Sequence, residues 1–255
     1  MQQDTFISHL IELRQRLVRT LTAVLVVFIA LLIWPGGGTI YDLLALPLMH
    51  ALPQGAKMIA TGVITPFIIP MKVTALAAFM IALPYVLYQA WAFVAPGLYE
   101  HEKKLALPIV VAGSLLFFLG VAFCYFFVFG KAFAFINEFA PKSITPAPDI
   151  EAYFSFVITM FVAFGVTFEI PIVVVLLARS GVVSVDKLAE ARPYVVLGNA
   201  VLAAVITPPD AVSMLALLIP MCLLYEVGLL IARLISVRSN AAEENTRVES
   251  RPLRD

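Results

Sequence analysis

Several runs of apolar residues, each long enough to cross a lipid bilayer as a helix, are the strongest constraint on how this chain can fold. A bilayer core about 30 Å thick needs roughly 20 helical residues to span it. Hydrophobic residues make up 62% of the 255 residues and charged residues only 13%, with a mean hydropathy of +0.97. This apolar share is well above that of an ordinary soluble domain. We therefore expect an all-α integral membrane protein.

The apolar runs predict six membrane-spanning helices, at about residues 18–34, 73–93, 105–129, 154–178, 194–206 and 211–234. Lys and Arg gather before the first predicted span, after the second, after the fourth and behind the last, and the opposite connections hold few of them. The positive-inside rule then places both termini in the cytoplasm. We predict that residues 1–236 form the six-span membrane domain. Residues 237–255 are charged and lack aromatics, which predicts a disordered cytoplasmic tail.

The fifth and sixth predicted spans are unusual. The fifth would be only about 20 Å long, and Thr207-Pro208-Pro209-Asp210 leaves almost no loop before the chain returns. Either the pair forms a tight hairpin packed inside the bundle, or the bilayer thins around it. Prolines inside the predicted spans remove backbone hydrogen bonds and bend helices, so we expect a curved bundle with a concave face. These prolines are Pro84, Pro108, Pro171 and Pro220, of which Pro108 alternatively marks a first helical turn.

Between the first two spans, the apolar pattern from Ile40 to Leu52 predicts a short interfacial helix, with Pro47 and Pro53 as breaks.

A short charged segment precedes the first predicted span. Its leucines recur at helical spacing and define one apolar face, while Glu12, Arg16 and Arg19 fall near one another on the helix. Two interpretations remain open. Glu12 and Arg16 form a surface ion pair worth about 0.3–0.5 kcal/mol, or the Glu12 carboxylate is presented beside the bilayer to a ligand.

A second charged segment, Glu100-His101-Glu102-Lys103-Lys104, follows the second predicted span on the same side of the membrane. Taken alone, it is typical of a solvated charge run. Its two acids stand where the topology favours bases, and they could converge with Glu12 in the fold.

Two further carboxylates lie within predicted spans. Glu169 stands close to the middle of the fourth span, where an ionisable group costs roughly 2.5–3.5 kcal/mol. We interpret it as a functional group facing a wet cavity or a partner helix. The alternative is a protonated carboxyl that is hydrogen-bonded within the bundle. Glu226, near the end of the sixth span, is either functional or a solvated charge that pairs with Arg233.

Composition and motifs argue against several classes of protein. The net charge is zero, so binding to nucleic acid has no support. Cys124 and Cys222 have no ligand-spaced neighbours and are interpreted as packed apolar residues. The histidines lie outside the predicted spans, and no metal-binding, nucleophilic or phosphate-binding motif is evident. We therefore expect neither an enzyme nor a cofactor.

Several segments in order along the chain resemble the TatC family, a subunit of the twin-arginine protein translocase. They include His9-Leu10-Ile11-Glu12-Leu13-Arg14, Ala95-Pro96-Gly97-Leu98-Tyr99, His101-Glu102, Phe168-Glu169, Arg192-Pro193-Tyr194 and Thr207-Pro208-Pro209-Asp210. The resemblance implies a multi-pass protein of the cell inner membrane that binds twin-arginine signal peptides and exports folded proteins. It further implies single-span TatA and TatB partners, a homo-oligomer within a receptor complex, and the proton-motive force as the energy source.

The resemblance also implies roles for individual residues. Glu12 and Glu102 fall on the family's signal-binding carboxylates, and Glu169 on its intramembrane glutamate. Adjacent arginines of an extended peptide point to opposite sides, so two carboxylates on separate segments engage them better than one. Each guanidinium can form bidentate, charge-assisted hydrogen bonds, which disfavours lysine. Supporting residues at this site would be Arg14, Arg16, His101 and Lys103, and partner docking would involve Thr207, Asp210 and Glu226.

A rival from another class is an ion-coupled secondary transporter with Glu169 as its proton site. We detect no internal repeat and no second broken helix with polar ligands, which such transporters commonly have.

Overall fold

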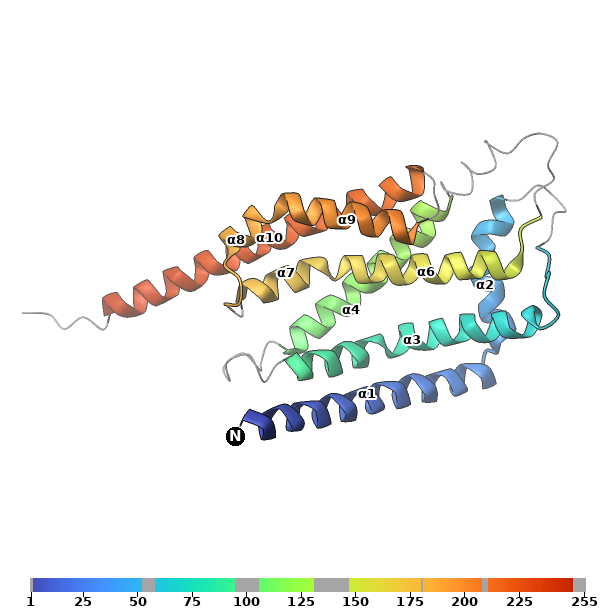
Figure 1. The fold of residues 1–255 in the computed structure, drawn as a ribbon, viewed down its shortest axis with the longest axis horizontal. Coiled ribbons are helices and arrows are strands. Elements are labelled where there is room, and N and C mark those ends of the chain that lie inside the picture. Colours follow the sequence, from blue (N-terminus) through green and yellow to red (C-terminus); the bar gives the residue numbers. More distant parts are fainter. Residues whose placement is uncertain are drawn as a thin grey trace, which may run out of the picture. The chain divides into compact units, whose positions relative to one another are not determined.

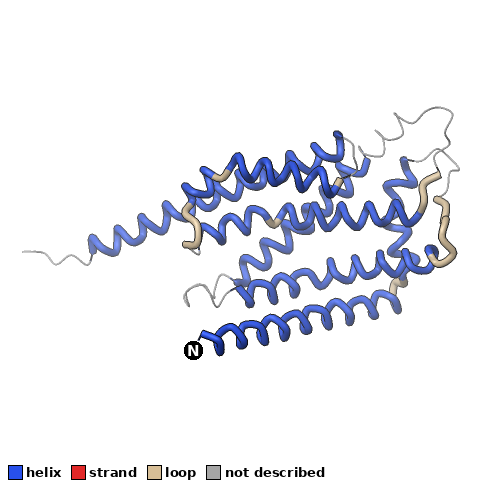
Figure 2. Tube along the Cα trace, viewed as in Figure 1, coloured by secondary structure: helices blue, strands red, loops and turns tan. Residues whose placement is uncertain are grey.

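The computed structural model describes residues 2–51, 58–94, 106–130, 147–179, 181–207 and 211–249. Within these ranges the chain is helical apart from connecting turns and an isolated β-bridge between Ile59 and Asp149 (Figure 2). The expected all-α fold is confirmed.

Five helical stretches within the described residues are long and apolar enough to cross a membrane. They are Leu10–Ile33, Thr65–Phe93, Leu107–Val128, Ile150–Arg179 and Ala211–Ile235. These match five of the six predicted spans. The other predicted span corresponds to the shorter apolar helix Arg192–Ile206. The total of six spans and the side on which the termini lie stay predictions.

The chain divides into two compact units, Met1–Val166 and Thr167–Asp255. The first holds α1 (Gln2–Ile33), α2 (Gly37–Ala51), α3 (Thr65–Val94), α4 (Ala106–Phe123), the π-helical turn η3 (Cys124–Val128) and most of α6 (Ile150–Phe168). The second holds α7 (Ile170–Arg179), α8 (Val185–Glu190), α9 (Arg192–Ile206) and α10 (Ala211–Glu249).

Helix α3 is central to the first unit, where it packs against α1, α2 and α4. Helices α1 and α3 lie side by side and run in opposite directions, so the N-terminal end of α1 meets the C-terminal end of α3 (Figure 1). Large apolar side chains of α1, including Leu17, Leu21 and Leu25, stay exposed. Lipid chains satisfy such a surface in a membrane-spanning helix.

The short helix predicted from Ile40 is confirmed as α2. Two tyrosine hydroxyls donate hydrogen bonds to backbone carbonyls near the middle of this helix. Pro47 has no backbone N–H, so it cannot donate to the Leu43 carbonyl four residues earlier. The Tyr125 hydroxyl donates to that carbonyl oxygen instead, at 3.2 Å. The Tyr153 hydroxyl donates to the Leu44 carbonyl oxygen at 3.1 Å. Pro47 therefore lies within α2 rather than ending it.

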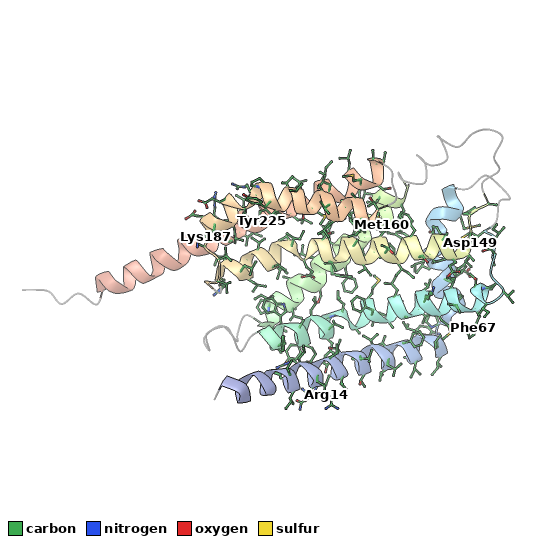
Figure 3. The ribbon with its side chains drawn as sticks, viewed as in Figure 1. Arg14, Phe67, Asp149, Met160, Lys187 and Tyr225 are labelled. Carbon is green, nitrogen blue, oxygen red and sulfur yellow. The ribbon has the colours of Figure 1, made fainter. Side chains whose placement is uncertain are left out.

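Asp149 joins the start of α6 to the segment before α3. Its Oδ1 accepts from the backbone N–H groups of Glu151 and Ala152, at 2.9 and 3.0 Å, and thus caps α6. Its Oδ2 accepts from the Thr61 hydroxyl at 2.7 Å and from the Thr61 N–H at 3.2 Å. Figure 3 shows Asp149 at the same end of the unit as Phe67, in the first turn of α3. These bonds hold the pKa of Asp149 below its ordinary value, with the Thr61 hydroxyl as the largest cause.

In the second unit α10 packs against α7, α8 and α9. One cluster of its buried residues consists of Val174, Leu188, Tyr225 and Leu229. The Tyr225 hydroxyl donates to the Leu188 carbonyl oxygen at 2.7 Å, which ties α8 to α10. At Gly228 the backbones of α7 and α10 come close: a Cβ there would lie 2.9 Å from Pro171 Cα.

The four prolines expected inside the predicted spans lie in different parts of their helices. Pro171 follows the break between α6 and α7, which the structure places at Glu169. Pro84 and Pro220 lie inside continuous helices, and Pro108 lies in the first turn of α4, which is the alternative considered for it.

Helix α10 is longer than the sixth predicted span, and the disorder of the tail stays a prediction. Its backbone continues to Glu249, through part of the stretch from Val237 that we predicted to be disordered. The tail is polar, but its Ala and Glu residues have high helix propensity and extend the preceding helix. The boundary of the membrane domain at residue 236 stays a prediction.

Candidate functional site

The Glu12 carboxylate lies in the first part of α1 and binds a guanidinium of its own helix. Arg16 Nη2 and Nε donate to Glu12 Oε1 at 2.6 and 3.0 Å. The side chains of Glu12 and Arg16 are 33% and 21% exposed. The ion pair considered from the i, i+4 spacing is therefore confirmed, and both of its side chains are partly exposed.

Gln89 brings a second acceptor to the same guanidinium. It lies near the C-terminal end of α3 and is only 5% exposed. Its Oε1 accepts from Arg16 Nη1 at 3.4 Å, a long hydrogen bond that joins α3 to α1. The antiparallel packing of the two helices produces this contact. One guanidinium thus meets acceptors from two helices.

Arg14 does not share this cluster. It is exposed, and Figure 3 shows it on the side of α1 away from α3. Glu12 and Arg16 lie one helical turn apart on one face, whereas Arg14 falls on another. Of the predicted supporting residues within the described ranges, Arg16 is therefore the one that contacts Glu12.

Four of the predicted site residues lie outside the described residues. They are His101, Glu102, Lys103 and Asp210. Their roles stay predictions.

Glu169 stands at the break between α6 and α7, in the apolar stretch Ile150–Arg179. Its backbone carbonyl accepts from the N–H groups of Ile172 and Val173, both at 3.0 Å, and so starts α7. Its side-chain Oε1 is buried and has no hydrogen-bond partner among the described residues. A buried carboxyl oxygen without a partner is costly, and the functional role of Glu169 stays a prediction.

The predicted docking residues of the second unit serve intramolecular contacts. The Thr207 side chain is buried, and its hydroxyl donates to the Ala203 carbonyl oxygen at 2.8 Å. Glu226 accepts from Arg192, Nε to Oε1 at 2.6 Å and Nη2 to Oε2 at 2.9 Å. Its partner is therefore Arg192 rather than Arg233. Their contribution to docking stays a prediction.

Comparison of this sequence with known protein families identifies the family to which the chain belongs. The model of the family "Sec-independent protein translocase protein (TatC)" matches residues 8–220 of this chain. The chain belongs to the TatC family. It is therefore a multi-pass protein of the inner membrane and a subunit of the Sec-independent Tat translocase.

Two bacterial TatC proteins match this chain over nearly their full length. TatC of Haemophilus influenzae is 43% identical over 249 residues, which cover 98% of this chain and 96% of that protein. TatC of Escherichia coli strain K12 is 44% identical over 244 residues, which cover 95% and 94%. A crystal structure of the twin arginine translocase receptor TatC is similar with a TM-score of 0.78 at 34% identity, and the match covers 89% of this chain and 99% of that one.

The contacts of two residues, Gln89 with Arg16 and Arg192 with Glu226, were missed from the sequence. Gln89 lies within the second predicted span, at about residues 73–93, where a lone amide was itself a signal of a buried polar contact. Arg192 belongs to a segment that carries the family resemblance, but its partner lies 34 positions away and no local spacing indicates it.

Proposed function

We propose that this TatC chain is the receptor for twin-arginine signal peptides and the core subunit of a translocase that exports folded proteins. The observation that carries the proposal is the Glu12 carboxylate, which binds a guanidinium with two donors at a partly exposed end of α1. A signal-peptide arginine offers the same chemical group. The crystal structure of a twin arginine translocase receptor with which this chain shares 34% identity supports the same role.

Glu102 is the second carboxylate of the proposed receptor, so that each of two adjacent arginines has an acid. Six spans with both termini in the cytoplasm would place Glu12 and Glu102 on one side of the membrane, as the distribution of Lys and Arg predicts. His101 and Lys103 would support that site.

We further propose that the chain assembles with TatA and TatB and forms a homo-oligomer within the receptor complex. The proton-motive force would be the energy source of this translocase. Glu169 serves a step after recognition, because its buried oxygen lies within the apolar stretch Ile150–Arg179. The second unit would offer the docking edge for the single-span partners through its short helix α9 and the segment around Asp210.

Photo-crosslinking of a signal peptide to the full chain in membranes tests this proposal. A benzophenone next to the arginine pair should crosslink to the parent chain, and much less to Glu12→Gln and Glu102→Gln. Glu190→Gln is the matched control, since Glu190 is an exposed acid on α8. Undiminished crosslinking in both carboxylate variants would contradict the receptor assignment.

A further inference from the structure

We infer that Gln89 is a second acceptor for the signal-peptide guanidinium that binds Glu12, and that Arg16 occupies this guanidinium site in the peptide-free chain. The inference rests on the proposed function of Glu12 and adds a residue of α3 to it.

The geometry shows what the site accepts. Three nitrogens of the Arg16 guanidinium contact acceptors: Nε and Nη2 contact Glu12 Oε1, and Nη1 contacts Gln89 Oε1. The acceptors come from two helices that pack directly on each other. A planar group with several fixed donors can engage both acceptors at once. Arg16 therefore stands in for the ligand's guanidinium.

Gln89 suits this role because it is buried and neutral. A buried side-chain amide needs a hydrogen-bond partner, and its carbonyl oxygen is directed at the guanidinium. It adds no charge, so it does little to attract a cation in general. A lysine ammonium is a compact point charge that satisfies Glu12 without matching the fixed spacing of two acceptors. Gln89 therefore contributes to the preference for arginine over lysine.

Arg16 has a different effect. Any cation that binds Glu12 must first displace it, whether that cation belongs to arginine or to lysine. The free energy needed to displace Arg16 is the same for an arginine and for a lysine ligand. It therefore weakens the affinity for both ligands by the same factor and leaves the ratio of the two affinities unchanged. The two roles thus give separable signatures: Gln89 sets the ratio of affinities, and Arg16 sets their absolute level.

Peptide titration of the full chain in nanodiscs tests both roles. Fluorescent signal peptides that differ only in an Arg-Arg or a Lys-Lys pair would be titrated against the parent, Gln89→Met, Gln89→Glu and Arg16→Gln. Met keeps the length of the side chain but has no carbonyl acceptor, whereas Glu keeps an acceptor. Arg19→Gln is the matched control for Arg16→Gln, because it removes a charge from an exposed position on the same helix.

We expect Gln89→Met to lower the Arg-Arg to Lys-Lys affinity ratio by about three- to tenfold, as for loss of one hydrogen bond to a charged group at a partly wet site. Gln89→Glu keeps an acceptor but adds a charge that attracts either cation, so it should bind both peptides more tightly, at a ratio above that of Gln89→Met. Arg16→Gln should tighten both peptides by about two- to fivefold at an unchanged ratio, the range for a part-exposed ion pair, and exceed the effect of Arg19→Gln.

Four results would overturn the inference. An unchanged ratio in Gln89→Met, while Glu12→Gln loses binding, contradicts the role of Gln89 and leaves the proposed function standing. Equal loss of the ratio in Gln89→Met and Gln89→Glu shows disturbed packing instead of a lost acceptor. Weaker binding in Arg16→Gln contradicts Arg16 as the resident occupant. A parent chain that binds neither peptide contradicts the proposed function itself, and the inference falls with it.

Discussion

The carboxylate of Glu226 accepts two parallel hydrogen bonds from the guanidinium of Arg192, at 2.6 and 2.9 Å. This bidentate pair joins the first residue of α9 to α10, and both side chains are about half exposed, at 42% and 45%. It holds the short helix α9 in place next to the Tyr225 contact with α8.

Removal of either charge of this pair should lower the melting temperature only slightly. A half-exposed ion pair is screened by water and salt, so we expect a loss of roughly 1–3 °C for Arg192→Gln or Glu226→Gln. The reversed pair Arg192→Glu with Glu226→Arg should recover most of the loss in melting temperature. If export fails in the reversed pair at a restored melting temperature, the individual charges contact a partner subunit.

Gly228→Ala should destabilise the second unit. The new Cβ would lie 2.9 Å from Pro171 Cα and 3.0 Å from Val174 Cβ, so the backbones of α7 and α10 must separate. Overpacking of this kind costs about 1–3 kcal/mol, and thermal unfolding of the purified protein would measure it. Gly198→Ala is the control, because nothing lies within 4 Å of a Cβ there. The alanine should stabilise α9 slightly. Equal effects of the two substitutions would contradict the close approach.

Tyr125→Phe should loosen α2. The Leu43 carbonyl loses the hydroxyl that replaces the N–H missing at Pro47, at a cost of about 1 kcal/mol. Pro47→Ala supplies that N–H, so Tyr125→Phe should cost much less in the Pro47→Ala background. Hydrogen exchange of α2 amides in all four chains would measure this coupling. Strictly additive effects would show that the hydroxyl and the missing N–H are unrelated.

Asp149 should give the first unit an acid-sensitive contact. Its pKa is lowered in the folded state, chiefly by the Thr61 hydroxyl, so the unfolded chain binds a proton more readily. The stability from this carboxylate is therefore present above its ordinary pKa of 3.8 and is lost as the pH falls through the lower folded value. Melting temperatures of the parent should fall more steeply below pH 4 than those of Asp149→Asn. Parallel curves for the two chains would refute this.

Glu169→Gln should separate recognition from later steps. The amide keeps the size of the side chain and removes its charge, while Pro171 and the helix break remain. We expect normal signal-peptide crosslinking but altered crosslinking to the single-span partners and reduced export. Normal export and normal partner crosslinking in this variant would exclude the proposed role of the buried oxygen.

Local patterns sufficed for the features that depend on neighbouring residues. The apolar runs predicted the long helices because membrane span and helix rise fix their length, and the i, i+4 spacing indicated the Glu12–Arg16 pair. The contacts of Arg16 with Gln89 and of Tyr125 with Leu43 join residues 73 and 82 positions apart. They depend on which helices pack together, and periodicity within one helix carries no such information.

The charged tail was judged by its polarity, and its disorder stays a prediction. The helix α10 extends as far as Glu249, in line with the helix propensity of its Ala and Glu residues.

A charge-reversal titration tests the central claim most directly. The parent and Glu12→Arg would be titrated with signal peptides that carry Arg-Arg, or Glu in place of either arginine. If Glu12 binds a signal-peptide arginine, Glu12→Arg loses affinity for the Arg-Arg peptide, and one of the two Glu-bearing peptides binds it more tightly than it binds the parent. Undiminished binding of the Arg-Arg peptide to Glu12→Arg, with no gain for either reversed peptide, would contradict the account.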